Sequence, residues 1–503
     1  FGLFGGGGDR GGRQPAYSME QLQQLHSRLQ SVKDKGDGTP SEREQMVKVI
    51  REITEALIWD EQNGGNDNQF FDFFCEKTIL ADFVGVMGLP VVPKTVKVQL
   101  LQTLSMLVQN IRRPTSLYYL FSNNYVNQLI STQLDWSDED ILGYYISFLK
   151  SLALKLNEET VKFFFNEKSQ QFPLYIEAVR FFGHREQMVR TAVRTLTLTV
   201  YRIEDTNMRR FVLERSSHTY FVHLACYLRE LWTQMQKAAQ RSEQALADVH
   251  QDHIDLLLYI KDILTEEMPN LGEALAERLL EYAMLPVLVG SLVEDGLPEA
   301  LGGAEASSGA GAAARLRPAC ALFVLHQVFC CCHSAALLPP LAGALLQSAH
   351  GPQTARCRVF RLPEPPATYR ATNADVSGPP STEGTPPEGA RPPGSALGPP
   401  MPQPGDPADS ASADGSGPLP RDRLLALLRQ PQDFTVSLVI GLLQALVDLR
   451  HEAWAGGVLA QAGLLPPPGS GLPGRARGAD AGAPDHGGCL SALGGYPRGR
   501  GPA

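Results

Sequence analysis

The sequence predicts an all-α fold, an armadillo- or HEAT-like α-solenoid with long disordered segments rich in Pro and Gly. Apolar residues recur every three or four positions, which places them on one face of a helix. Breakers rich in Gly, Pro and Asn separate these helical stretches. The central apolar residues of four similar helices, Leu57, Leu104, Leu149 and Leu196, lie 47, 45 and 47 residues apart. Such a period is typical of repeats built from two or three helices.

The N-terminal half contains the regularly spaced helices. A short helix is expected over 19–32. The next one begins at a capping box, in which Ser41 accepts from a free backbone amide and Glu44 reaches back to another. Further helices are expected over 70–75, 94–111 and 117–130.

The stretch 137–203 organises the rest of the chain. Ser137 is the candidate N-cap of its first helix, because acidic residues follow it and its hydroxyl can accept from a free amide. The second helix carries an apolar stripe over 188–203. Between them lies an aromatic-rich connection that contains Phe172-Pro173-Leu174. Helices with such stripes need neighbours to cover their apolar faces.

Helices continue in the C-terminal half. Pro286 falls inside one of them and is expected to break or kink it. The uncharged segment 319–338 has the length of a membrane span, but it contains two histidines and Pro339 follows it. A buried solenoid helix and a membrane span both fit this segment. The further helices are expected over 211–239, 249–264, 271–292, 319–346, 421–429 and 434–450.

Composition divides the chain into helical and low-complexity parts. Segments dominated by Gly, Pro, Ala and Ser cannot bury enough apolar surface to offset their conformational entropy, so they are expected to be disordered. The predicted divisions are a disordered tail over 1–16, a helical repeat domain over 17–205, a continuing solenoid over 206–346 with a disordered insert near 295–318, a disordered Pro-rich linker over 347–420, a helical segment over 421–465 and a disordered tail over 466–503.

Charge and cysteine usage restrict the class of function. The formal net charge of −9 argues against nucleic acid as a main ligand, since phosphate binding favours a basic surface. Three of the eight cysteines are adjacent, at Cys330, Cys331 and Cys332, which suits no secreted disulfide framework. A reducing cytosolic compartment is the simpler interpretation. The first residues lack the apolar core of a signal peptide.

Few residues have the pattern of a chemical site. His250 and His253 are three apart on an expected helix and could share a metal, although a solvated polar face explains them equally well. The adjacent cysteines and His333 have the wrong spacing for zinc, and core packing is favoured over palmitoylation. A Gly-rich match at residues 6–11 lacks the strand that a nucleotide site needs. No cofactor, metal, nucleic acid or small-molecule substrate is therefore expected.

A locally basic stretch offers one candidate docking surface. Arg190 and Arg194 lie one helical turn apart and could hold an acidic peptide or a phosphoinositide head group. A solvated helix face is the competing interpretation. Clustered aromatic residues such as 163–165 are expected mainly in the core.

Several long runs resemble one known family. These are TSLYYLFSNNYVNQLI over 115–130, DEDILGYYISFLKSLALKLN over 138–157, the Phe172-Pro173-Leu174 position and MVRTAVRTLTLTVY over 188–201. They are similar to the FPL domain of the C-type lectin domain family 16 member A proteins, whose fly relative is Ema. The resemblance covers 17–205 and continues more weakly over 250–346 and 421–450.

The resemblance implies a function in membrane traffic. Members of the family are described as cytosolic proteins that attach peripherally to endosome, lysosome or Golgi membranes. They act in endosome maturation, autophagy and mitophagy through tethering and ubiquitin-pathway partners. The expected function is a non-enzymatic scaffold. The alternative, also implied by the family, is an E3 ubiquitin ligase or ligase subunit, which here lacks a recognisable catalytic motif. The family offers no catalytic residues to carry over.

Overall fold

The structure is a computed structural model that describes residues 17–34, 39–63, 68–88, 92–293, 316–346, 420–429, 433–452, 454–455 and 458–459. Over these residues every regular element is a helix, and the only strand-like pairing is an isolated bridge between Asn166 and Gln171. The chain divides into two compact units. The first contains Phe1–Tyr220 and Thr265–Gly272, and the second contains Phe221–Leu264 and Glu273–Ala503.

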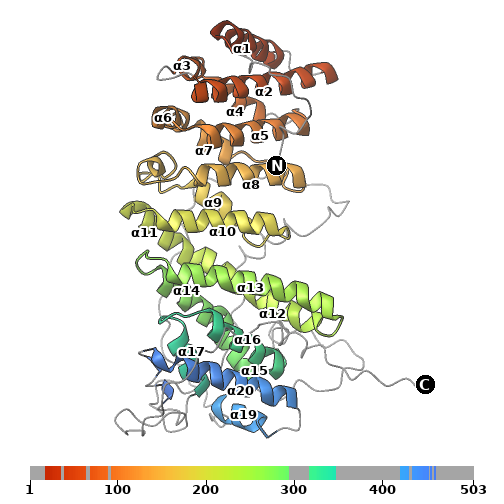
Figure 1. Cartoon of the computed structure of the whole chain (residues 1–503), viewed down its shortest axis with the longest axis vertical. Coiled ribbons are helices and arrows are strands. Elements are labelled where there is room, and N and C mark those ends of the chain that lie inside the picture. The colour runs from red at the N-terminus through yellow and green to blue at the C-terminus, as the bar shows by residue number, and fades with distance from the viewer. Residues whose placement is uncertain are drawn as a thin grey trace, which may run out of the picture. The chain divides into compact units, whose positions relative to one another are not determined.

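Four long helices pack one on the next in the first unit (Figure 1). These are α2 (Pro40–Asn63), α5 (Lys94–Asn110), α8 (Glu139–Ala153) and α10 (Gln187–Arg202). The four apolar residues that define the period occupy equivalent buried positions, since Leu57, Leu104, Leu149 and Leu196 are each exposed by 2% or less. The residue spacing therefore identified the repeat correctly.

Shorter helices complete each repeat of the first unit. Two rows run beside the long helices: α3 packs on α6 and α6 on η1, while α4 packs on α7 and α7 on α9. The repeats are thus α3–α5, α6–α8 and η1–α10, and α1 packs on α2 at the start. This three-helix arrangement confirms the predicted armadillo-like α-solenoid. The bounds are α1 (Met19–Asp34), α3 (Gln69–Glu76), α4 (Ile79–Gly88), α6 (Pro114–Ser122), α7 (Tyr125–Ile130), the 3-10 helix η1 (Thr160–Phe163), α9 (Pro173–Arg180), α11 (Thr206–Arg215) and the π-helix η2 (Ser216–Tyr220).

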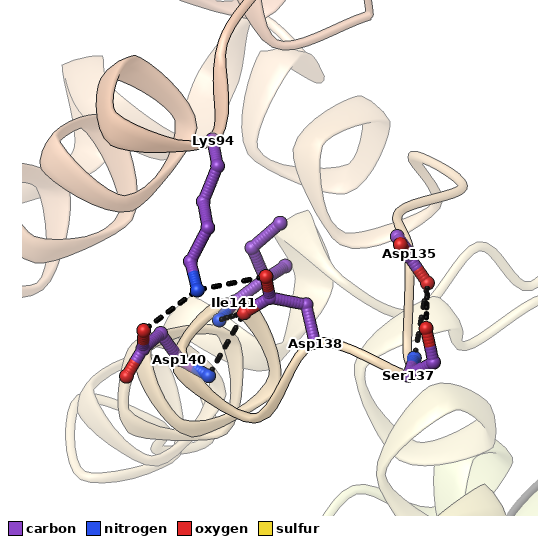
Figure 2. Close-up of polar contacts among 6 residues, drawn as sticks. All are labelled: Lys94, Asp135, Ser137, Asp138, Asp140 and Ile141. Carbon is purple, nitrogen blue, oxygen red and sulfur yellow. Dashed lines mark hydrogen bonds and ion pairs between the residues drawn. The ribbon is translucent and has the colours of Figure 1, made fainter. Parts of the chain in front are cut away.

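The N-cap of α8 is Asp138, so the prediction of Ser137 is wrong by one residue (Figure 2). The Asp138 carboxylate accepts from the amides of Asp140, at 3.0 Å, and Ile141, at 3.1 Å. The Ser137 hydroxyl instead donates to Asp135 over 2.6 Å. A carboxylate is the stronger acceptor at the positive end of a helix, and the local turn at Asp135 already uses the serine.

The capping box of α2 also begins earlier than predicted. The helix starts at Pro40, and Thr39 and Glu42 exchange bonds across its first turn. The Thr39 amide donates to the Glu42 carboxylate over 2.9 Å, and the Glu42 amide donates to the Thr39 hydroxyl over 3.4 Å. Pro is favoured at the first helical position because its missing N–H would be unsatisfied there in any case. The sequence therefore predicted a capping box correctly but placed it two residues too late.

The second unit is also helical throughout its described part. Pro286 does not end its helix, because it lies within a π-helical segment, η3, that continues α14 into α15. A π-helix is a frequent way to accommodate an irregularity inside a helix. The bounds are α12 (Phe221–Ala238), α13 (Glu243–Thr265), α14 (Leu271–Leu279), η3 (Leu280–Val289), α15 (Gly290–Val293), α16 (Pro318–Cys331), α17 (Leu338–Leu346), α19 (Pro420–Leu427), α20 (Asp433–Asp448) and η5 (Leu449–His451).

The segment that could have spanned a membrane forms a shorter buried helix. Within it α16 ends at Cys331, and Leu322, Val324 and Leu325 are fully buried. Pro339 lies in the first turn of α17 rather than ending the preceding helix. Among the described residues, one helical window, Phe434–His451, has the length and mean hydropathy (1.3) of a span. Its helix α20 packs on α16 and α19, and 28% of the window is buried.

Several predicted segments lie outside the described residues. These are the tail over 1–16, the linker over 347–420 apart from Pro420, the tail over 466–503, almost all of the insert near 295–318 and most of the predicted helical segment 421–465 after residue 455. The predicted domain divisions therefore remain predictions.

Candidate functional site

A pocket of about 520 Å³ lies in the first unit, at the joint between the repeats α6–α8 and η1–α10. Its wall is formed by α7, by η1 with the three aromatic residues around its end, by the turn after them, and by the first residue of α9. The volume falls within the range of about 300–1,000 Å³ that is typical of ligand sites. The lining residues are Asn124, Asn127, Gln128, Ser131, Lys162, Phe163, Phe164, Phe165, Asn166, Glu167, Lys168, Gln171 and Pro173.

Asn127 connects the two repeats across the pocket. Its side-chain amide nitrogen donates to the backbone carbonyl of Phe163 over 2.7 Å and to the side-chain oxygen of Asn124 over 2.8 Å. Asn124 precedes α7 with a left-handed φ of 59°, a conformation that Asn tolerates better than most residues. These contacts position α7 against η1.

A tight turn forms the outer wall. Asn166 and Gln171 pair through backbone bonds of 2.8 and 3.2 Å, which closes the loop between them. The Asn166 side chain accepts from the amides of Lys168, at 3.0 Å, and Ser169, at 3.1 Å, and Gln170 adopts a φ of 49°. The turn is thereby held by its own polar residues, as Asx-turns commonly are.

The Phe172-Pro173-Leu174 motif contributes to both the core and the pocket wall. Phe172 and Leu174 are fully buried, and the Phe172 ring packs on Phe165 and Tyr175 with centroids 6.1 Å away from each. Pro173 begins α9 and is the motif residue that lines the pocket. Phe172 and Leu174 therefore have a structural role, and Pro173 faces the pocket.

The polar groups of the pocket are incompletely matched. The side-chain oxygen of Asn127 is buried and has no hydrogen-bond partner among the described residues. Lys162 and Lys168 are exposed, and neither forms an ion pair within the described part of the chain. The Glu167 carboxylate accepts from Asn207 of α11 over 2.9 Å. The pocket lining thus contains two cationic side chains and one carboxylate, and the Asn127 oxygen beside it is buried without a donor among the described residues.

The structure separates the two arginines predicted to dock a partner. Arg190 is 5% exposed, and its guanidinium donates to the carbonyls of His184, at 3.0 Å, and Arg185, at 2.7 Å. It therefore holds the turn between α9 and α10. Arg194 is half-buried. A docking role for the pair stays a prediction, and the burial of Arg190 argues against its part in it.

The histidine and cysteine candidates lie in the second unit. His253 is fully buried, and neither of its ring nitrogens has a hydrogen-bond partner among the residues that the structure describes. The rings of His250 and His253 are 6.4 Å apart between centroids. No group of three or more His, Cys, Asp or Glu residues able to hold a metal occurs among the described residues. Cys332 is buried and Cys330 is exposed, so the three adjacent cysteines face different surroundings.

The pocket itself was not predicted from the sequence. Its residues come from three segments that the repeat brings together, and no spacing rule connects them. A weak signal existed in the two short polar runs SNNYVNQ, over 122–128, and NEKSQQ, over 166–171. Both runs interrupt aromatic-rich helices, which is where exposed functional loops are often found.

Two family models match the chain. The FPL model, described as an uncharacterised conserved protein, matches residues 50–201 and so includes the whole pocket. The CLEC16A helical domain matches residues 241–356. A designed armadillo repeat protein is similar in structure, with 11% identity and a TM-score of 0.30 over 51% of this chain and 99% of that chain. That score is too low to support any argument, and the fold rests on the helix packing described above.

Related proteins occur in animals and a plant. The CLEC16A homolog of Drosophila melanogaster is 41% identical over 302 residues, which are 59% of this chain and 28% of that protein. CLEC16A of Homo sapiens is 40% identical over 315 residues, 61% of this chain and 28% of that protein. TRANSPARENT TESTA 9 of Arabidopsis thaliana is 32% identical over 290 residues, 56% of this chain and 34% of that protein.

The matches thus span about a third or less of the length of these relatives. They agree with the two family models and with the runs that resemble the C-type lectin domain family 16 member A and Ema proteins. The chain belongs to the CLEC16A family.

Proposed function

We propose that the chain is a non-enzymatic helical scaffold in endosomal and lysosomal membrane trafficking and in autophagy, including mitophagy. It acts through protein partners of tethering and ubiquitin pathways, and it associates peripherally with endosome, lysosome or Golgi membranes. The proposal depends mainly on the architecture of the first unit, in which three-helix repeats stack and a polar pocket opens where two of them meet. Helical repeats of this kind present extended surfaces that suit binding to other proteins.

A second candidate function is an E3 ubiquitin ligase or ligase subunit that works through a thioester. One contact favours it: the exposed Cys330 thiol lies 3.7 Å from Nε2 of His326, one turn earlier in α16. A histidine beside a cysteine can promote the reactive thiolate. Cys330 is also the one exposed cysteine among the six that the structure describes.

Several other described cysteines are poorly suited to such chemistry. Burial raises the pKa of Cys75 and Cys226 to about 11 and the pKa of Cys320 and Cys332 to about 12. A thiol with a raised pKa forms little of the thiolate that attacks a thioester. A test of the ligase hypothesis can therefore begin with Cys330.

The scaffold is tested in cells that lack their own CLEC16A family member. The full chain should restore autophagic flux and clearance of damaged mitochondria, and it should fractionate partly with endolysosomal membranes. The Cys330→Ala variant should restore both as well as the unaltered chain does. Absence of any restoration by the folded full chain would contradict the proposed role in trafficking.

A biochemical arm separates the two functions. The purified chain is incubated with E1, a charged E2 enzyme and ubiquitin, and reducible adducts are sought by gel electrophoresis. A scaffold forms no adduct, whereas a thioester ligase forms one that is lost in Cys330→Ala and retained in Cys331→Ala. A reducible adduct, together with the failure of Cys330→Ala to restore function in cells, would favour the ligase hypothesis over the scaffold hypothesis.

A further inference from the structure

Three side chains of the types that bind zinc lie near the end of α16 in the second unit. His326 and Cys330 are four residues apart, so they lie one turn apart on the same face of the helix. The helix ends at Cys331, and His333 follows it by two residues. Unlike the three adjacent cysteines, whose side chains leave the helix in different directions, this set takes one thiol and two imidazoles. Both are ligands that zinc accepts in proteins.

The first two donors already have the separation of ligands on one zinc ion. The Cys330 Sγ lies 3.7 Å from Nε2 of His326. In a tetrahedral site, a Zn–S distance of about 2.3 Å and a Zn–N distance of about 2.0 Å place the two donor atoms about 3.5 Å apart. The two separations agree to within about 0.2 Å, the tolerance expected of a metal site, so one ion can contact both donors after a small adjustment.

His333 supplies a third donor after a rotation of its side chain. Its Nε2 lies 3.1 Å from the backbone carbonyl of Cys330, the residue that also provides the thiol. The imidazole is exposed, so its rotation disturbs no core packing. In the described arrangement the ring stays on the carbonyl, and no set of three donors is assembled among the described residues. An ion on the first two donors would therefore recruit the third.

The surroundings of the pair suit a cation. Cys330 is in the last turn of α16, where unsatisfied carbonyl groups and the helix macrodipole give a partial negative charge. That charge disfavours an isolated thiolate, because reactive thiolates are stabilised at helix N-termini or beside cations. Helix α20 approaches His326 with Gly441, at which a Cβ would lie 3.8 Å from Nε2. The glycine keeps bulk away from the coordinating nitrogen.

We propose that His326, Cys330 and His333 bind one Zn²⁺ ion and leave its fourth position open to water. The Cys330 thiol releases its proton to solvent when the ion binds, and both imidazoles bind in their neutral form. The ion ties the end of α16 to the segment that leads into α17. This inference goes beyond the proposed function, since neither the scaffold nor the thioester hypothesis uses a metal.

Zinc binding is measured with the full chain after a chelator has removed any metal. Zn²⁺ is titrated in competition with a chromophoric chelator, and a parallel titration uses Co²⁺, whose absorption reports a bound thiolate. We expect one tight equivalent of Zn²⁺ per chain at this site and a thiolate-to-cobalt charge-transfer band. Absence of a tight equivalent, or a cobalt spectrum without that band, would overturn the proposal.

Substitutions locate the ion. Cys330→Ala should abolish the tight equivalent and the charge-transfer band, and His326→Gln and His333→Gln should each weaken binding at least about tenfold. His333→Cys replaces one type of zinc ligand by another and should retain tight binding. Cys331→Ala and His218→Gln are matched controls, because they remove a thiol and an exposed imidazole outside the set. Both controls should leave binding unchanged, and circular dichroism checks that every variant is folded.

Other outcomes would reject the site or its metal. Equal losses in Cys330→Ala and Cys331→Ala would place the ion elsewhere. Tight binding that survives His333→Gln would reduce the site to a pair of ligands and overturn the three-ligand assignment. Tight Cu⁺ binding through the same three residues, without tight Zn²⁺ binding, would replace zinc by copper. The titrations contain neither ubiquitin nor an E2 enzyme, so their result is independent of the ligase test.

Discussion

The Lys94 ammonium lies 2.8 Å from the Asp138 carboxylate, so the first residue of α5 contacts the N-cap residue of α8 (Figure 2). The same ammonium lies 2.7 Å from Asp140. Hydrogen bonds to these two carboxylates raise the pKa of Lys94, and the bond to Lys94 is the largest cause that lowers the pKa of Asp138. One cation thereby connects the starts of two successive long helices.

Asp138→Ala should lower the free energy of unfolding of the first unit by about 1 kcal/mol, because two amides of α8 lose their acceptor. Asp138→Asn should lower the free energy of unfolding by less, since Asn also caps helices. The measurement is chemical denaturation followed by circular dichroism. Ser137→Ala is the control and should change stability by less than about 0.5 kcal/mol. A larger loss of unfolding free energy in Ser137→Ala than in Asp138→Ala would show that Ser137 is the N-cap.

Glu61→Ala should destabilise the first unit by about 2 to 3 kcal/mol. Glu61 is 8% exposed, and its carboxylate accepts from the amides of Arg112, at 2.8 Å, and Arg113, at 2.6 Å. Its removal leaves two donors without partners between α5 and α6. Glu61→Gln keeps an acceptor and should retain more of the stability, and Gln62→Ala on the exposed side of the same helix should have little effect. Urea titration compares the three variants, and similar losses in all of them would contradict this role.

Phe172→Ala should cost about 3 to 5 kcal/mol, because a fully buried ring is replaced by a cavity. Pro173→Ala should cost less than about 1 kcal/mol, since other residues are tolerated at the first helical position. The melting temperature of each variant checks the difference. Comparable melting temperatures for the two variants would show that Phe172 has no dominant packing role.

The second unit should lose stability on acidification below about pH 6.5. Burial lowers the pKa of His223 to about 4 and, with a smaller effect of His250, the pKa of His253 to about 3. Below the ordinary histidine pKa of 6.5, the unfolded chain binds protons that the folded unit does not accept. The free energy of unfolding should fall by up to about 1.4 kcal/mol per pH unit for each histidine until the folded pKa is reached.

The acid prediction is checked by denaturation between about pH 7 and about pH 5. Burial also lowers the pKa of His250, so His253→Gln removes one of three titrations and should reduce the slope of stability against pH. Leu258→Gln changes an exposed residue of the same helix that does not titrate, and it should leave the slope unaltered. A slope that is the same in all three proteins would exclude His253 as its source.

The sequence predicted the repeat well because burial alone determines it. Leu57, Leu104, Leu149 and Leu196 share one environment, and a period of apolar residues reports that environment directly. Helix starts were less accurate, since Thr39 and Ser41, or Ser137 and Asp138, offer competing caps a residue or two apart. At α8 the ion pair of Asp138 with Lys94, which is distant in the sequence, adds to the local preference for Asp138.

The candidate site was harder to predict for the same reason. Arg190 was expected in a docking surface, but it lies in the first turn of α10 and its guanidinium donates to two carbonyls of the turn before that helix. A charged residue near a turn gives no indication of whether it faces solvent or backbone. The pocket depends on the approach of Asn127 to Phe163, a contact across 36 positions that no local pattern encodes.

The contact between Asn127 and Phe163 also has a mechanical consequence. It crosses the seam where one repeat meets the next, so any bending of the stack at that seam alters the separation of the pocket walls. A ligand that prefers one separation therefore favours one curvature of the stack, and by thermodynamic reciprocity an imposed curvature changes the affinity for the ligand. Tension applied along the first unit would therefore shift the same conformational equilibrium that a ligand in the pocket shifts.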